Sequence, residues 1–242
     1  MKALPVVAVI MAFVFFPFSS YAEELEFGTD LQVNSKYMWR GLEINKDPQF
    51  QPDAWMSYGG FTLTVWGGMD LTDRNDEKMN FSEIDYIIEY ERTFDKVICG
   101  LGYIYYDYPS TDYAWTHEVF ASVGYDVFLT PTLTVYRDMR EGKGWYATFG
   151  LSHEIPITTY CTLALSGSLG FSSKDDSEYF YGESTNSFSD SLITVALQFP
   201  VTENITIIPS VNYTALLGPM RNENINNHDD TFWGGVNVAL SF

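Results

Sequence analysis

From residue 26 to its end, the sequence repeats short segments in which apolar and polar residues alternate. In the last segment, Phe232, Val236 and Leu240 share one parity, and Asn237 lies on the other. Successive side chains of a strand point to opposite faces, so this pattern predicts strands with one apolar and one polar face. Twelve such strands are predicted, over residues 26–42, 49–58, 61–70, 82–92, 97–106, 113–127, 133–140, 145–155, 159–171, 192–199, 205–216 and 230–242.

Strands with one apolar face must stack into a soluble sandwich or close into a membrane barrel, because open sheet edges expose unpaired backbone groups. Short turns alternate with longer polar loops along most of the chain. Outer-membrane barrels have this arrangement, with short periplasmic turns and longer external loops. An even number of strands places both termini on the periplasmic side. We therefore expect an all-β fold, a transmembrane antiparallel up-and-down β-barrel of about 12 strands.

Aromatic residues make up 17% of the chain and gather at the ends of the predicted strands. Two bands of this kind are typical of the interfacial girdles of a membrane barrel, and a soluble sandwich has no reason to contain them. One band is predicted at the periplasmic ends, with Tyr58, Phe61, Phe94, Phe128, Phe199 and Phe242, and one at the external ends, with Trp39, Trp115, Trp145 and Phe232.

The first 22 residues have the organisation of a secretory signal peptide. Lys2 supplies the positive region, Leu4 to Phe18 the apolar region, and Ser19 to Ala22 a cleavage site of small residues. The apolar run is too short for a stable transmembrane helix. We therefore expect residues 1–22 to be removed and residues 23–242 to form one β-barrel in the cell outer membrane.

The formal net charge of the chain is −19, which argues against nucleic acid as a partner, since nucleic-acid binding requires a basic face.

There are two cysteines, Cys99 and Cys161. The predicted strands place them four strands apart, farther than a disulfide can reach. Both are expected to be small apolar residues of the outer face.

The polar parity of the predicted strands carries many more carboxylates than basic side chains. Lining a lumen, such a wall raises the local concentration of cations. This favours a porin-like channel for passive diffusion of small solutes with a cation preference. Alternatively, ion pairs, such as Arg40 with Asp53, Asp70 or Glu83, plug the interior and leave a non-conducting structural or binding barrel. The candidate lumen-lining residues are Asp30, Lys36, Arg40, Asp53, Trp66, Asp70, Glu83, Asp85, Glu89, Glu118, Asp138 and Arg140.

The sequence contains no pattern that indicates an enzyme. A nucleophile needs a base within hydrogen-bond reach, which on one strand means two residues away on the same face. His117 and His153 have only apolar residues at that spacing. No His or Cys pair has metal-ligand spacing. The acidic loops could bind divalent cations through oxygens, although a solvated loop explains them equally. We expect no catalytic residue, no metal site and no cofactor.

The expected partners are outer-membrane lipid, lipopolysaccharide and small solutes. Arg137 falls on the lipid-facing parity near the external end, where it meets a lipid phosphate unless a bulge turns it inward. The protein is expected to be a monomer or a small homo-oligomer.

Several short segments resemble the TorF-type porins of Gram-negative outer membranes. They are 35–41 (SKYMWRG), 48–52 (PQFQP), 65–67 (VWG), 82–86 (SEIDY), 102–109 (GYIYYDYP) and 135–138 (VYRD). The resemblance covers most of the chain after residue 22 and is strongest over 33–140. It implies an outer-membrane barrel that forms a channel, and it assigns no functional residue.

Overall fold

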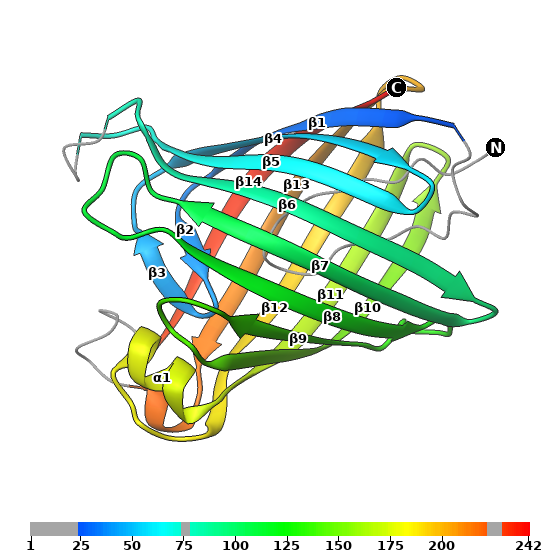
Figure 1. Cartoon of the computed structure of the whole chain (residues 1–242). Helices are drawn as coiled ribbons and strands as arrows, with labels where there is room; N and C mark the ends of the chain where they lie inside the picture. The colour runs from blue at the N-terminus through cyan, green and yellow to red at the C-terminus, as the bar shows by residue number, and fades with distance from the viewer. Residues whose placement is uncertain (1–23, 74–77, 222–228) are drawn as a thin grey trace.

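The computed structural model describes residues 24–73, 78–221 and 229–242; the expected signal peptide, residues 1–22, lies outside them. Twelve antiparallel strands form a closed barrel, which confirms the predicted fold (Figure 1). Each strand pairs with its neighbours along the chain, and β1 pairs with both β4 and β14. The barrel strands are β1 Glu26–Asn34, β4 Gln49–Tyr58, β5 Phe61–Asp70, β6 Phe81–Phe94, β7 Val97–Asp107, β8 Thr116–Tyr125, β9 Thr132–Asp138, β10 Trp145–Thr158, β11 Cys161–Ser172, β12 Ser187–Pro200, β13 Ile205–Leu216 and β14 Asp230–Ser241.

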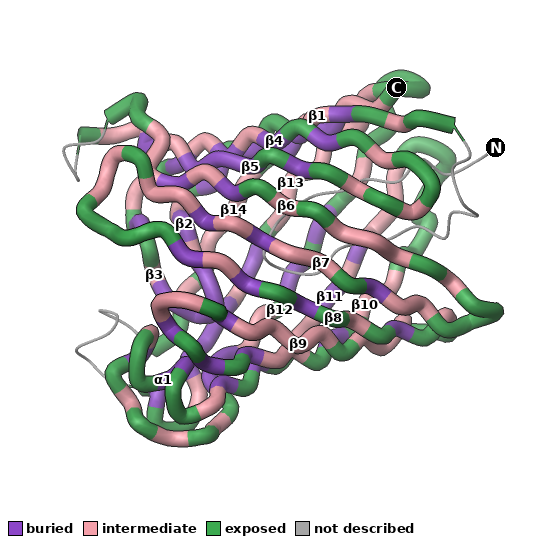
Figure 2. The backbone as a smooth tube through the Cα atoms, in the orientation of Figure 1, coloured by how far each residue is buried: buried purple, intermediate pink, exposed green. Residues whose placement is uncertain are grey.

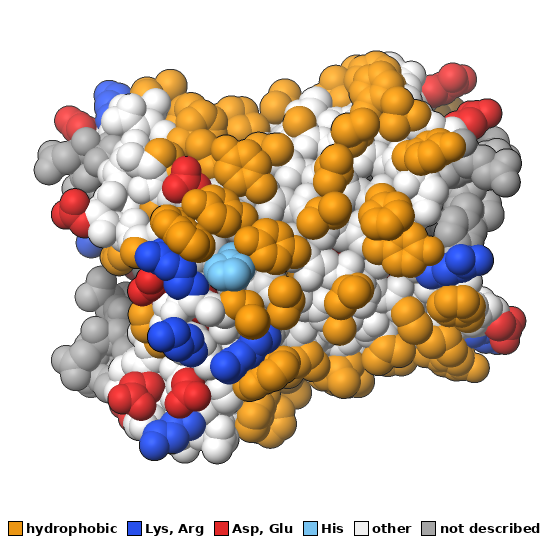
Figure 3. Space-filling view, viewed as in Figure 1, with side chains coloured by type: hydrophobic (Ala, Val, Ile, Leu, Met, Phe, Trp, Pro, Cys, Tyr) orange, Lys and Arg blue, Asp and Glu red, His pale blue; other side chains and the backbone are white. Residues whose placement is uncertain are grey.

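The alternation of the sequence becomes an inside and an outside of the barrel. On β1, Leu31 is 40% exposed and the neighbouring Asp30 only 4%. Figure 2 shows buried and exposed positions alternating along the strands in the same way. Figure 3 shows apolar side chains spread over the middle of the outer surface, with charged side chains at both ends. An apolar exterior around a polar interior is the reverse of a soluble core and suits a lipid environment.

The barrel closes where the two ends of the chain meet. The backbones of Phe27 and Phe242 exchange hydrogen bonds of 3.2 and 2.9 Å, and their rings stack with centroids 5.7 Å apart. The start of β1 and the end of β14 therefore lie at the same end of the barrel, called the terminal end below. The opposite end is called the plug end. Cys99 and Cys161 are both free, as expected.

The predicted first strand, 26–42, is wrong in its second half. Strand β1 ends at Asn34, and the chain then forms a separate two-stranded hairpin of β2 (Tyr37–Trp39) and β3 (Leu42–Asn45). Arg40 and Gly41 form its two-residue turn with φ of 47° and 79°. Positive φ at both central positions matches the twist of a hairpin. Glycine at the second position adopts this conformation without steric cost.

The predicted loop between residues 172 and 190 contains a helix, α1 (Lys174–Tyr181). It ends at Gly182, whose φ of 72° is the left-handed conformation usual at helix C-termini. A short 3-10 helix, η1 (Gly218–Met220), follows β13 at the same end of the barrel. No helix in the described part of the chain is long and apolar enough to cross a membrane.

The hairpin and helix α1 together form what is called the plug below, since both pack at one end of the barrel (Figure 1). Trp39 was expected in the external aromatic band facing lipid; instead it is buried inside, against Phe180 of α1 at 4.7 Å between ring centroids. In the hairpin, residues alternate in the same way as on a strand that faces lipid on one side. The hairpin as a whole folds into the barrel, so its apolar side chains are buried there. The buried cluster around it consists of Tyr37, Trp39, Leu42, Trp66, Tyr181, Leu216 and Met220.

Candidate functional site in the barrel interior

Arg40, at the tip of the hairpin, binds the wall of the barrel across the bore. Its Nη2 donates to both carboxylate oxygens of Glu118, at 2.9 and 2.7 Å. Glu118 lies on β8, five strands around the barrel from β1. The hydroxyl of Tyr106 on β7 donates to the same carboxylate at 2.8 Å. The sequence interpretation paired Arg40 with Asp53, Asp70 or Glu83; the structure pairs it with Glu118, because the hairpin carries it to the far wall.

Aromatic rings enclose the same guanidinium. Its central carbon lies 4.3 Å from the ring centroid of Trp39, 4.1 Å from that of Tyr146 and 5.1 Å from that of Tyr136. A cation over aromatic faces in a site closed to water is stabilised by about 2 kcal/mol. The hydroxyl of Tyr181 on α1 also donates to the backbone carbonyl of Arg40 at 2.8 Å. The turn is therefore held by its side chain and by its backbone.

Helix α1 adds a second carboxylate. The Asp176 Oδ1 lies 3.8 Å from Nη1 of Arg40, and both side chains are almost fully buried. Burial raises the pKa of Asp176 to about 6, and the nearby Arg40 offsets part of that increase. Gly144 permits the contact, since a Cβ there would lie 2.2 Å from the backbone nitrogen of Asp176. At this level the plug and the wall bring buried charged and aromatic side chains together inside the barrel.

Amides and carboxylates of β1, β4 and β5 form a continuous chain of hydrogen bonds along the opposite wall. Asn34 donates to Gln51 at 2.6 Å, Gln51 to Gln49 at 2.7 Å, and Gln49 to Asp70 at 2.8 Å. Gln32 extends the chain by donating to Asn34 at 3.0 Å. The sequence interpretation selected only the acidic member of this chain. Its amides lie on the inward parity, which was the signal that could have identified them.

Two other predicted carboxylates of this wall lie next to each other. Asp53 Oδ1 accepts a hydrogen bond of 3.2 Å from the backbone nitrogen of Asp30, and the side-chain amide of Asn237 donates to Asp30.

Glu83 and Asp85 on β6 are buried on the inner face, and Oδ1 of Asp85 has no hydrogen-bond partner in the structure. The inner face of β6 is thus the most densely acidic part of the wall.

Nearer the terminal end, the interior is less covered. Glu89 and Glu91 are half-buried on the inner face of β6, opposite Gly102 and Gly100 of β7. Glu154 on β10 is exposed and accepts a hydrogen bond of 2.9 Å from Gln198. Between these carboxylates and the plug lies an apolar patch of one wall. It consists of Ile104, Tyr106 and Phe120, with Ile87, Tyr108 and Tyr136 packed against them.

The remaining candidate residues lie at or near the plug end. Trp66 belongs to the buried cluster around the hairpin, and Asp138 is buried and accepts a hydrogen bond of 2.8 Å from Thr116. Arg140 does not point into the bore. Its guanidinium lies 3.8 Å from the ring centroid of Trp115, which is exposed on the outer surface.

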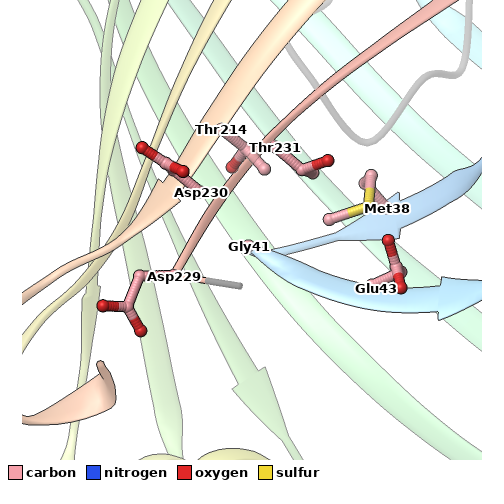
Figure 4. A pocket seen from close by; sticks show the side chains of 7 residues that line it. All are labelled: Met38, Gly41, Glu43, Thr214, Asp229, Asp230 and Thr231. Atoms are coloured by element: carbon pink, nitrogen blue, oxygen red, sulfur yellow. The ribbon is translucent and has the colours of Figure 1, made fainter. Parts of the chain in front are cut away.

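A pocket lies between the hairpin and strands β13 and β14 (Figure 4), and Lys36 binds two of the residues that line it. Its Nζ donates to Glu43 at 2.5 Å and to Thr231 at 3.2 Å. In Figure 4, Asp229 and Asp230 point away from Glu43, so these carboxylates do not converge on a common point. The pocket is lined by Met38, Gly41, Glu43, Thr214, Asp229, Asp230 and Thr231.

Within residues 24–73, 78–221 and 229–242, no three His, Cys, Asp or Glu side chains come together in a way that could hold a metal ion. His117 packs between the rings of Tyr103 and Trp115, at centroid distances of 5.5 and 5.9 Å. His153 packs against Phe128 at 4.5 Å. The surroundings of both histidines are aromatic rings of the outer face.

No protein-family model matches the chain, and no curated protein matches its sequence. Solved structures match its fold. The NanC porin aligns with a TM-score of 0.58 and 11% identity, over 88% of this chain and 98% of that one. The KdgM porin aligns with a TM-score of 0.55 and 12% identity, over 90% of this chain and 99% of that one. The chain has a porin fold.

KdgM has also been solved in a complex with disordered oligogalacturonate. At these identities the likeness to both porins concerns the fold. It agrees with the architecture predicted from the sequence, while membership of the TorF-type family stays a prediction. The porin fold explains why polar side chains face inward here, since the interior of such a barrel is polar and its lipid face is not.

Proposed function

We propose that the protein is an outer-membrane channel through which small solutes diffuse passively, with a preference for cations. In this proposal residues 1–22 direct export and are removed, residues 23–242 form the barrel, and the terminal end faces the periplasm. It is not an enzyme. Its partners are the surrounding lipid and the passing solute.

One observation carries the cation preference. In the described barrel strands, lysine and arginine occur only at Arg92 and Arg137, and both lie on the outward parity. The inward positions carry carboxylates on β1, β4, β5, β6, β8, β9, β10 and β12. Rings of carboxylates select cations, because they concentrate positive ions and repel negative ones. An anionic sugar such as the oligogalacturonate of KdgM would meet repulsion along this wall.

In this proposal, conduction depends on the position of the plug. Arg40, Trp39 and Tyr181 fill the bore at the plug end, while Glu89 and Glu154 nearer the terminal end are accessible to water. In the docked position the plug supports the second candidate function, a non-conducting barrel that binds a partner through its loops. Displacement of the hairpin or of α1 would open the path.

The test is the reversal potential of the refolded protein in planar bilayers under a tenfold KCl gradient. A cation-preferring pore gives a potential of the sign set by potassium, between zero and roughly 59 mV. A potential of the chloride sign contradicts the cation preference. Absence of conductance in the wild type and in a variant with a loosened plug favours the non-conducting barrel.

A further inference from the structure

Two arginines lie against exposed tryptophan rings on the outer surface of the plug end. The guanidinium carbon of Arg140 is 3.8 Å from the ring centroid of Trp115, and that of Arg137 is 5.2 Å from that of Trp145. The tryptophans are 42% and 53% exposed. Figure 3 shows Lys and Arg side chains gathered next to apolar ones at this end of the barrel. The pairs thus lie where the apolar surface meets the polar rim.

Strand pairing fixes one of these cations on the lipid-facing side. Arg137 on β9 lies opposite Val119 of β8 and Trp145 of β10, and Val119 and Trp145 are both exposed on the outer face. The inward turn considered from the sequence does not occur. A guanidinium at this position is costly in hydrocarbon and favourable at the headgroup level. Arg137 therefore marks the level of the interface.

Backbone carbonyls, which carry no net charge, hold both guanidinium groups. Arg137 donates to the carbonyl of Lys143, and Arg140 donates to the carbonyl of Trp115. Arg140 also lies 3.4 Å from the carboxylate of Glu141, a half-buried neighbour. The exposed Lys143 adds a third cation to the same turn between β9 and β10. Among the contacts of these three side chains, called the rim cluster below, Glu141 supplies the carboxylate, while the buried Asp138 accepts hydrogen bonds from the backbone nitrogens of Arg140 and Lys143.

We propose that the rim cluster, Arg137, Arg140 and Lys143, binds the phosphate groups of lipopolysaccharide in the external leaflet. The net charge of the chain is −19, so most of its polar surface repels an anionic lipid. A local group of cations beside the apolar surface attracts an anionic lipid, and each basic residue contributes about 1 kcal/mol to the binding free energy. Trp115 and Trp145 lie beside the bound headgroup, where amphipathic rings are favoured. This proposal rests on the proposed function in one respect only, which is that the plug end faces the exterior of the cell.

The opposite rim contains a matched control. Arg92 lies on the outward parity of β6 with its guanidinium carbon 5.5 Å from the ring centroid of Phe94. It has the same chemistry, an outward arginine beside an exposed aromatic ring, but it lies at the terminal end. Arg92→Gln removes one cation from the protein without changing the rim cluster.

The experiment titrates the refolded full chain in detergent with bisphosphorylated lipid A and follows its thermal midpoint. Lipid A stripped of its phosphates and phosphatidylglycerol are titrated in parallel. The variants are Arg137→Gln/Arg140→Gln, Lys143→Gln and the control Arg92→Gln. Lys143 is exposed, so its variant gives a second readout if the double variant does not fold. Migration on unheated gels shows which variants are folded barrels.

We expect the double variant to bind lipid A roughly thirtyfold more weakly and Lys143→Gln roughly fivefold more weakly, with Arg92→Gln unchanged. Stripped lipid A should bind poorly to every form of the protein. The proposal is overturned if wild type and Lys143→Gln titrate alike, or if removing the phosphates has no effect. It is equally overturned if phosphatidylglycerol binds as tightly as lipid A, which would assign the rim cluster to anionic lipids in general. This experiment measures lipid binding and not conductance. A negative result would therefore leave the channel proposal intact, and a protein that does not conduct would leave the lipopolysaccharide proposal intact.

Discussion

Replacing Arg40 by glutamine removes the cation that joins the plug to the far wall of the barrel. Glu118 is 1% exposed and accepts both hydrogen bonds from this guanidinium. Asp176 lies 3.8 Å from it and is equally buried. Glutamine is shorter and neutral, so in the variant both carboxylates are left in a dry site without a cation. The closed position of the plug is therefore destabilised.

The size of the effect follows from the burial of the pair. Removing one partner of a buried ion pair costs about 3–5 kcal/mol, because the remaining charge stays desolvated. The barrel strands keep their own backbone hydrogen bonds, so this cost falls on docking of the plug. At 1.4 kcal/mol per factor of ten, the ratio of open to closed plug rises by roughly two to three and a half orders of magnitude.

The assay is single-channel recording of Arg40→Gln in planar bilayers, reported as the fraction of time spent conducting. The matched control is Lys36→Gln, at the residue directly before the same hairpin. Lys36 pairs with Glu43 at 2.5 Å, but the two side chains are 25% and 15% exposed. Partly exposed pairs contribute about 0–1 kcal/mol, so the control should change the conducting fraction by less than about fivefold. If both variants conduct like the wild type, Arg40 does not hold the bore closed.

Three further predictions concern the same interior. Glu89→Gln with Glu91→Gln should move the reversal potential toward zero at unchanged fold, because these half-buried carboxylates face the bore; an unchanged potential would place the selective region elsewhere. Gly41→Ala should destabilise docking of the plug by about 1–3 kcal/mol, because the φ of Gly41 is 79° and a Cβ there would lie 2.7 Å from Leu216. The variant should therefore conduct for a larger fraction of the time. A conducting fraction equal to that of the wild type would contradict this prediction. Burial raises the pKa of Asp176 from 3.8 to about 6 when α1 is docked, so the docked position becomes more stable as the pH falls from about 6 toward 3.8. Conductance should therefore decrease over this pH range, and Asp176→Asn should abolish the decrease. An equal decrease in the variant would exclude Asp176 as the cause.

The barrel could be predicted from the sequence because its strands obey a local rule. A strand that faces lipid on one side and a polar interior on the other must alternate, as Asp30 and Leu31 do. The hairpin obeys the same rule in another setting. Tyr37 and Trp39 alternate with Lys36 and Met38 as an outward-facing strand would, so local pattern alone places them on the lipid side.

Parity likewise identified acidic residues such as Glu118 and Asp85 as inward-facing, and the structure buries both on the inner side of their strands. The partner of Arg40 could not be obtained in this way. Glu118 is 78 residues away along the chain, and the contact depends on how far the hairpin reaches into the bore. Helix α1 was missed because its eight residues are mostly polar and give little periodic signal.

The central claim is that one face of each strand meets lipid while the other lines a polar bore. The most direct test attaches a spin label to one position at a time along residues 84–91 of β6, in a background with Cys99 and Cys161 replaced by serine, and measures collisions in lipid bilayers. Positions 86 and 88 should be reached by oxygen dissolved in the lipid, and positions 89 and 91 by a water-soluble nickel reagent, with a period of two residues. Equal access of both reagents along the strand, or the opposite phase, would contradict the claim.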